Sequence, residues 1–189
     1  KRDCNIRLGV TRAGNVIGGG DWANDRVVPD CIRAASLGES VEIRKPRATR
    51  PWQHVLEPLS GYLSLGVTLV DDESLAGESF NFGPAAAQNK SVGELIEEMS
   101  SVWGSIKMRD ISERSDGVHE AGLLKLNCDK ALHYLGWMPT LTFEENVEMT
   151  VSWYREYYDN GPAAMRDYTL DQIDKFRTLA IHRELSWAI

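Results

Sequence analysis

Residues 12–22 read RAGNVIGGGDW and continue a β-branched, apolar run from Ile6 to Arg12 that predicts a strand. Glycine has no Cβ, so a strand that enters a glycine-rich loop lets the backbone approach a ligand closely. Ligands of open α/β sheets bind at the carboxyl ends of strands, where the Asn15 amide could donate to a phosphate or sugar oxygen. A plain turn would explain the same residues. Three adjacent glycines also lack the G-x-G-x-x-G spacing of a dinucleotide site.

The remainder of the chain alternates predicted strands with predicted helices, which indicates an α/β fold. Further strands are expected at residues 40–44, 78–82, 106–111 and 123–126. Helices are expected at residues 26–38, 55–70, 91–103, 129–136, 142–158 and 169–181. Asp25 should cap the first helix, and Ser91 with Glu94 and Thr142 with Glu145 predict capping boxes. Residues 182–189 show no clear pattern and could be frayed or docked on a neighbour.

The apolar side of the helix at 169–181 is expected to comprise Leu170, Ile173, Phe176 and Leu179–Ala180. Residues 45–52 contain two prolines and are expected to form a loop.

Composition narrows the class of protein. The 189 residues are 42% hydrophobic and 26% charged, which is typical of a globular domain, and no apolar run approaches membrane-spanning length. The net charge is −7, yet residues 1–50 hold ten Lys and Arg against six Asp and Glu. This balance argues against a nucleic-acid binder and favours a local anion site in an acidic body. Cys4, Cys31 and Cys128 contain no C-x-x-C and indicate reduced cytosolic thiols.

Residues 44–52 concentrate positive charge: Arg44, Lys45, Arg47 and Arg50 lie within seven residues without an acid. A guanidinium binds phosphate through a planar fork of donors, so the loop predicts a diphosphate clamp. A solvated basic loop explains each residue singly, but less well their concentration in an acidic chain. Trp52 could stack on a base or fill a gap in the core.

The remaining polar residues give weaker indications of a functional site than the glycine-rich loop and the basic loop do. Glu120 could accept hydrogen bonds from a ribose diol, or could be a surface carboxylate. His119, Asp116 and Cys128 lack metal-ligand spacing, so no metal site is expected. His54 and His133 are expected to be packed or helix-surface histidines, and the aromatic group at 153–158 to serve packing or a subunit contact. No nucleophile–base constellation is present.

Several motifs together resemble one family. In chain order they are RAGNVIGGGDW, DRVVPD, RPWQHVLEPLSGY, FNFGP, HEA, LKLNCDKA and LGW. This series is similar to the nucleotide-sugar 4,6-dehydratases of the extended short-chain dehydrogenase/reductase group over nearly all of residues 6–177. The resemblance implies the C-terminal part of a doubly wound NAD-binding (Rossmann) sheet with a small α/β substrate-binding domain. Residues 1–90 would mix Rossmann and substrate segments, and residues 91–181 would mainly bind substrate.

The resemblance also implies roles for particular residues. Asn15 and Arg50 match positions at the sugar-nucleotide diphosphate, and Ala13 lies where backbone approaches the nicotinamide of NAD. The other expected substrate-binding residues are Arg26 at the phosphates, Val27, Ile43 and Arg44 beside the base, Asn81 near the nucleotide, and Glu120 at the ribose or base. The particular combination of motifs favours CDP-glucose as the nucleotide sugar.

The departures from the family are substantial. The glycine-rich NAD loop and the catalytic Tyr-x-x-x-Lys do not occur in the sequence, so no catalytic residue is assigned and the chain is expected to be inactive alone. The parent protein would be a cytoplasmic, homodimeric, NAD-dependent lyase. The alternatives are a fragment of another nucleotide-sugar dehydratase or epimerase, a non-catalytic nucleotide-binding or assembly module, and a purely structural fragment.

Overall fold

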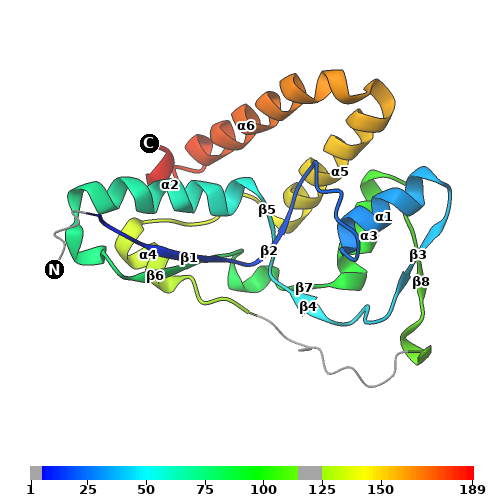
Figure 1. Ribbon diagram of the computed structural model, residues 1–189, viewed down its shortest axis with the longest axis horizontal. Helices are drawn as coiled ribbons and strands as arrows, with labels where there is room; N and C mark the ends of the chain where they lie inside the picture. Colours follow the sequence, from blue (N-terminus) through cyan, green and yellow to red (C-terminus); the bar gives the residue numbers. More distant parts are fainter. Residues whose placement is uncertain (1–5, 115–124) are drawn as a thin grey trace.

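The computed structural model describes residues 6–114 and 125–189, which form an α/β structure with mostly parallel strand pairs (Figure 1). The strands are β1 (Val10–Ala13), β2 (Asn15–Ile17), β3 (Ser40–Ile43), β4 (Thr49–Arg50), β5 (Trp52–His54), β6 (Ser79–Phe82), β7 (Lys90–Ser91) and β8 (Lys107–Asp110). The α-helices are α1 (Val27–Ser36), α2 (Leu56–Asp71), α3 (Val92–Val102), α4 (Asp129–Leu135), α5 (Phe143–Asn160) and α6 (Met165–His182). Among these helices, none has the length and apolar character needed to cross a membrane.

The strands pair two by two. β1 pairs with β6, β2 with β5 and β3 with β8, all in parallel, whereas β4 and β7 pair antiparallel. Figure 1 shows α2 lying along β1 and β6, while α1 and α3 lie beside β3 and β8 at the other end of the molecule. The parallel strands joined through helices confirm the predicted α/β class.

Two hydrophobic clusters hold these pairs in place. Under α2, Phe80 and Phe82 of β6 are buried, and a Cβ on Gly61 would lie 2.2 Å from the Phe82 ring. Glycine at that position therefore lets α2 approach β6 closely. The larger cluster joins α1, β3, α3 and α5, with Cys31 and Val147 both fully buried in it. This cluster includes residues from both 1–90 and 91–181. The separate roles expected for these two segments stay predictions.

The expected helix signals are largely confirmed. Ser91 with Glu94 and Thr142 with Glu145 form complete capping boxes at the starts of α3 and α5. Gly136 ends α4 in the left-handed conformation, with φ 61°. These ends were predictable because the caps act through residues only three or four positions apart.

Other boundaries differ from the prediction. β1 begins at Val10 rather than Ile6, because its pairing with β6 covers only Val10–Ala13. The loop expected at 45–52 contains β4 and the first residue of β5, Trp52. Asp25 does not cap α1: its φ is 60°, Arg26 occupies the N-cap position, and no side chain caps the helix. Residues 125–126 form no strand, and the rest of the strand expected at 123–126 lies outside the described residues.

The C-terminal helix also corrects the prediction. α6 begins at Met165, and Leu170 and Ile173 are exposed although both were assigned to its apolar face. Gln172 is buried instead and donates through Nε2 to the carbonyl of Met149, 2.7 Å away. Residues 182–189 dock on the chain itself, since the Trp187 ring stacks on Phe176 at 5.8 Å.

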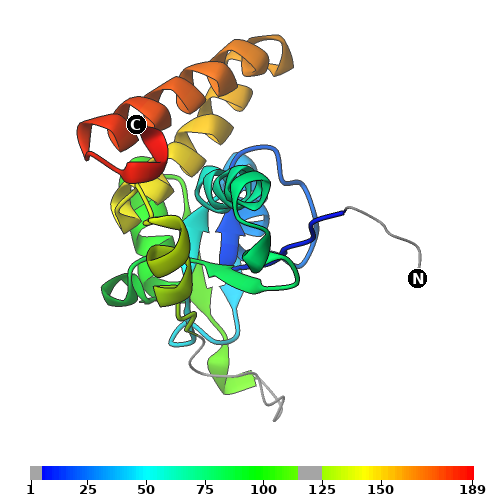
Figure 2. The same cartoon turned by 90° about the vertical axis from the view of Figure 1, so that its left-hand side faces the viewer.

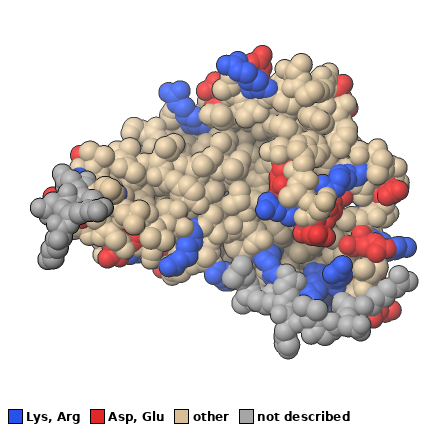
Figure 3. Space-filling view, in the orientation of Figure 1, with Lys and Arg blue, Asp and Glu red and all other residues tan. Residues whose placement is uncertain are grey.

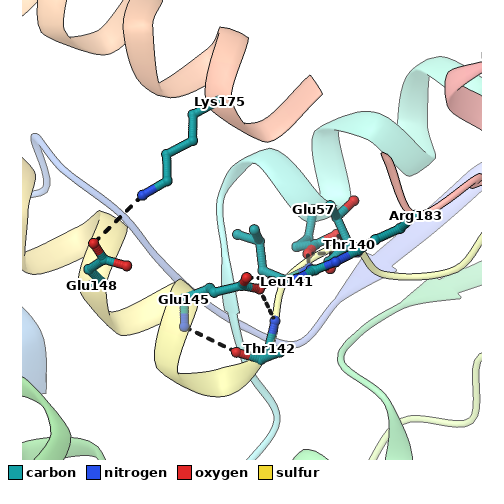
Figure 4. Close-up of polar contacts among 8 residues, drawn as sticks. All are labelled: Glu57, Thr140, Leu141, Thr142, Glu145, Glu148, Lys175 and Arg183. Carbon is teal, nitrogen blue, oxygen red and sulfur yellow. Dashed lines mark hydrogen bonds and ion pairs between the residues drawn. The ribbon is translucent and has the colours of Figure 1, made fainter. Parts of the chain in front are cut away.

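A buried carboxylate connects α2 to the start of α5 (Figure 4). Glu57 is 1% exposed, and its Oε1 accepts the backbone amides of Thr140 at 2.9 Å and Leu141 at 2.6 Å. Beside it, Arg183 donates to the Thr140 carbonyl and forms an ion pair with Glu145 at 2.6 Å. Burial raises the pKa of Glu57 to about 7, against the opposing effect of the two amide donors.

We expect Glu57→Gln to reduce the pH dependence of folding stability. The folded state binds the Glu57 proton more tightly than the unfolded chain, so the free energy of unfolding should fall as pH rises from about 4.5 to about 7. The loss should amount to at most about 3 kcal/mol. Urea denaturation at pH 5 and pH 7.5 measures it, with the exposed Glu97→Gln as control. Equal losses in the wild type and Glu57→Gln would contradict the expectation.

Candidate functional site

A cavity of about 940 Å³ lies at the carboxyl ends of β1, β2 and β3. Three segments supply most of its lining: residues 13–18, residues 21–30 and residues 42–52, which contribute Arg26, Arg44, Lys45 and Arg50. Val92 and Leu126 complete the lining from more distant parts of the chain. The volume falls within the range of roughly 300 to 1,000 Å³ of small-molecule sites.

The cations of the cavity come from separate elements. Arg26 precedes α1, Arg44 and Lys45 follow β3, and Arg50 lies in β4. Arg50 is only 8% exposed, and its Nη1 donates to the Thr49 carbonyl at 2.8 Å, which fixes the side chain. Convergence of four basic side chains gives the cavity the donors that an oxyanion requires.

Carboxylates also line the cavity, but among the described lining residues three of the four are paired with arginines. Asp21 forms an ion pair with Arg26 at 2.9 Å, Asp30 pairs with Arg33, and Glu42 pairs with Arg109; Asp25 is the fourth. Figure 3 shows this mixture of Lys and Arg with Asp and Glu on the side of the molecule that carries α1 and β4. An incoming anion would therefore compete with Asp21 for the guanidinium of Arg26.

The first turn of α1 faces the same cavity, where Val27, Val28 and Pro29 are lining residues. The first amides of a helix have no partner within the helix, and the helix dipole places partial positive charge at this end. Because no side chain caps α1, its N-terminus adds to the attraction of the cavity for anions.

The glycine-rich loop is held by aromatic residues of α5. A Cβ on Gly19 would lie 2.0 Å from the Trp153 ring, and a Cβ on Gly14 would lie 2.5 Å from the Pro51 carbonyl. These two glycines are thus required by packing within the chain; Gly14 also lines the cavity, and its close approach to a ligand stays a prediction. The Tyr154 hydroxyl donates to the Asp21 carbonyl at 2.7 Å, which ties α5 to the residue that pairs with Arg26.

The structure brings together seven of the nine residues expected at the site. The lining residues among them are Ala13, Asn15, Arg26, Val27, Ile43, Arg44 and Arg50. Asn81 is not among the lining residues; it lies on β6, accepts from Arg12 at 3.4 Å and donates to the Asn127 carbonyl at 3.0 Å. Glu120 lies outside the described residues.

Trp52 and His54 serve mainly to pack the strand that carries them. Trp52 borders the cavity, but it is 5% exposed and its Nε1 donates to the Lys90 carbonyl at 3.0 Å. His54 is 2% exposed, burial lowers its pKa to about 4, and its backbone amide donates to Oδ1 of Asn146 at 2.8 Å. His133 is exposed on α4. Both histidines therefore agree with the packed or helix-surface interpretation.

Three residues with a role in the structure were not predicted from the sequence: Val92 and Leu126 line the cavity, and Glu57 is a buried structural carboxylate. The sequence around Val92 and Leu126 gives no sign of a binding role, because only the folded chain brings these two residues beside residues 13–52. Glu57 did carry a signal, since it is the one acid in the apolar run from Val55 to Val70. In the described parts of the chain, no group of three His, Cys, Asp or Glu residues could hold a metal ion.

Comparison with known proteins gives sequence relatives and structural neighbours. The chain is 43% identical over 155 residues to CDP-glucose 4,6-dehydratase of Salmonella typhimurium, an alignment that covers 80% of this chain and 42% of that enzyme. It is 25% identical over 164 residues to dTDP-glucose 4,6-dehydratase of Streptomyces antibioticus, covering 82% of this chain and 44% of the relative. The chain therefore spans less than half the length of these curated relatives. No family model matches it.

Solved structures show the same fold. UDP-glucuronic acid 4-epimerase of Bacillus cereus, in complex with UDP-glucuronic acid and NAD, matches 83% of this chain and 48% of its own, with a TM-score of 0.68 and 18% identity. dTDP-glucose 4,6-dehydratase of Bacillus anthracis, in complex with NAD, matches 78% of this chain and 44% of its own, with a TM-score of 0.62 and 24% identity. The chain is a partial homologue of CDP-glucose 4,6-dehydratase and is related in sequence to the nucleotide-sugar 4,6-dehydratases.

We expect Gly19→Ala to destabilise the chain by about 1–3 kcal/mol, because the added methyl group would overlap the Trp153 ring. Gly104→Ala is the matched control, since a Cβ there meets no atom within 4 Å and the backbone does not have a positive φ. Urea denaturation of the two variants and the wild type measures the effect. If Gly19→Ala were as stable as Gly104→Ala, the contact with Trp153 would not hold the loop.

Proposed function

We propose that this partial homologue of CDP-glucose 4,6-dehydratase binds CDP-glucose in the cavity beside α1, and that it is the C-terminal, substrate-binding half of an NAD-dependent dehydratase. The observation that carries the proposal is the convergence of four cations on one cavity in a chain of net charge −7. The parent enzyme would convert CDP-glucose to CDP-4-keto-6-deoxyglucose.

The diphosphate is the part of the substrate for which the cavity is best equipped. Arg26 and Arg50 would donate to its oxygens, while the N-terminus of α1 would place backbone amides and partial positive charge nearby. Asn15 would donate from the start of β2. Fixing the phosphates in this way would orient the sugar, because its ring is attached directly to them.

The nucleoside would lie against the segment after β3. In this proposal Val27, Ile43 and Arg44 border the base, and Glu120 contacts the ribose or the base; Asn81, which does not line the cavity, is no longer assigned a contact. Val27 and Ile43 offer apolar surface to one side of the base, and Arg44 offers a planar cation that can stack on it. The identity of the base would depend on a few polar contacts, which is why the nucleotides must be compared directly.

The residues present do not fit a complete NAD site. Ala13 borders the cavity, but the sequence has no G-x-G-x-x-G loop to hold the pyrophosphate and no Tyr-x-x-x-Lys. We propose that the part of the dehydratase beyond the matched region supplies these groups. This chain would then bind and orient the nucleotide sugar without transforming it. The homodimeric state and cytoplasmic location of the parent protein stay predictions.

Titration of the chain with CDP, UDP, GDP and dTDP in a calorimeter tests the proposal, alongside a thermal melt that shows the chain to be folded. CDP should bind at least about tenfold more tightly than the others, a difference of about 1.4 kcal/mol. Equal affinities would favour another nucleotide-sugar dehydratase or epimerase. A cooperative melt without binding would exclude the substrate-binding role. No turnover of CDP-glucose is expected when NAD is added to this chain alone.

Removal of one cavity cation should weaken CDP binding without unfolding the chain. Arg26→Ala should raise the Kd by about ten- to a hundredfold, because a charge-assisted hydrogen bond contributes about 1.5–3 kcal/mol. Arg26 is exposed in this structure, so its loss should not open the core. Arg166→Ala is the matched control, since it removes the same charge from an exposed site in α6. Equal Kd values for both variants would argue against a phosphate contact by Arg26.

A further inference from the structure

Asp21 and Arg26 lie at the two ends of a short loop, and both residues line the cavity. Oδ2 of Asp21 accepts from Nη1 of Arg26 at 2.9 Å, and Oδ1 accepts the backbone amide of Ala23 at 3.0 Å. The carboxylate therefore balances the charge of Arg26 and fixes one side of its guanidinium. A phosphate that binds Arg26 must either displace this carboxylate or lie close to it, and both cost binding free energy.

The loop between the two residues is held by two helices. α5 lies with α6 above the strands in Figure 2, and from it Tyr154 donates to the Asp21 carbonyl at 2.7 Å. From α1, Arg33 donates to the carbonyls of Trp22 at 3.1 Å and Ala23 at 3.2 Å. Because the backbone of the loop is fixed in this way, the ion pair can open only through movement of the two side chains.

Arg26 is the member of the pair that is free to move. Its side chain is 64% exposed, against 33% for that of Asp21, whose other carboxylate oxygen is engaged in the loop. An ion pair this exposed is weak, whereas hydrogen bonds between a guanidinium and a phosphate are among the strong ones in proteins. A diphosphate can therefore take Arg26 from Asp21 without rearranging the loop.

This arrangement distinguishes Asp21 from the neighbouring carboxylates. Asp30 and Glu42 also line the cavity, but they pair with arginines outside its described lining. Asp21 pairs with Arg26, which is itself a lining residue. Its charge therefore acts on a cation that faces the cavity.

We infer that Asp21 is a positioning residue that acts through Arg26: it withholds the guanidinium and yields it to a diphosphate, so that the strength of the pair sets the affinity for the nucleotide. The inference rests on the proposed function, in which Arg26 binds the diphosphate. A nucleoside without phosphate does not draw on Arg26. Asp21 therefore lowers the affinity for CDP and leaves that for cytidine unaltered.

A double-mutant cycle measured by calorimetric titration tests the inference. Asp21→Asn keeps an acceptor for the amide of Ala23 and removes the charge that faces Arg26. In dilute buffer it should lower the Kd for CDP about three- to fivefold, the upper part of the range for an exposed ion pair, and leave the Kd for cytidine unchanged. In the Arg26→Ala variant the same substitution should change the Kd for CDP by less than about 1.5-fold.

Asp25→Asn is the matched control, because it removes one negative charge from the same cavity. Asparagine tolerates the left-handed backbone at this position, where φ is 60°. The effect of this substitution on the Kd for CDP should be the same with Arg26 and with Arg26→Ala. Thermal melts show that each variant folds, and Asp21→Ser, which also offers an acceptor oxygen, replaces Asp21→Asn if the latter does not melt cooperatively.

Inorganic pyrophosphate is the second probe, since it carries the diphosphate without the nucleoside. Weaker or unchanged CDP binding by Asp21→Asn would overturn the inference, because Asp21 would then orient Arg26 or have no influence on it. A gain that persists in Arg26→Ala would overturn it as well, since the charge would act on the whole cavity. If the wild-type chain binds pyrophosphate but not CDP, the proposed function fails and the same cycle is read with pyrophosphate. Binding of neither probe would remove both proposals.

Discussion

The carboxylate of Glu57 accepts the amides of Thr140 and Leu141 in a region closed to water. A buried carboxylate without such partners would be strongly unfavourable, so the chain between α4 and α5 must lie where it does. Trp137, in the same connection, reinforces this placement by donating to Ser60 of α2 at 2.9 Å. These polar contacts with the helix that covers β1 and β6 fix the start of α5, whose buried side then packs in the larger hydrophobic cluster.

The placement of α5 in turn shapes the cavity. Asn146 accepts the amide of His54 in β5, and Trp153 lies against Gly19 in the loop that borders the cavity. Tyr154 holds the carbonyl of Asp21, whose carboxylate pairs with Arg26. A helix that contributes no lining residue thus fixes the loop and one of its cations. The shape of the cavity therefore depends on the packing of α5 behind the loop as well as on the residues that line the cavity.

The sequence by itself determined the α/β class, most of the helices and the concentration of positive charge near the N-terminus. These features are local: capping boxes act over three residues, and Arg44 to Arg50 form one loop. The order of the motifs, beginning with the one around Asn15, was enough to suggest the family. The helix at 165–182 was placed too late and its buried face was misassigned, because periodicity cannot distinguish a buried Gln172 from an exposed Ile173.

Only the tertiary structure decided which residues share the cavity and which edges stay open. Val92 and Leu126 join the lining, and Asn81 lies away from it, because strand pairing and helix packing place residues far apart in sequence. The shortening of β1 to Val10–Ala13 has the same origin, since a strand forms its ladder only where a neighbour supplies partners. Propensity and spacing act within a few residues, whereas burial and pairing depend on the whole chain.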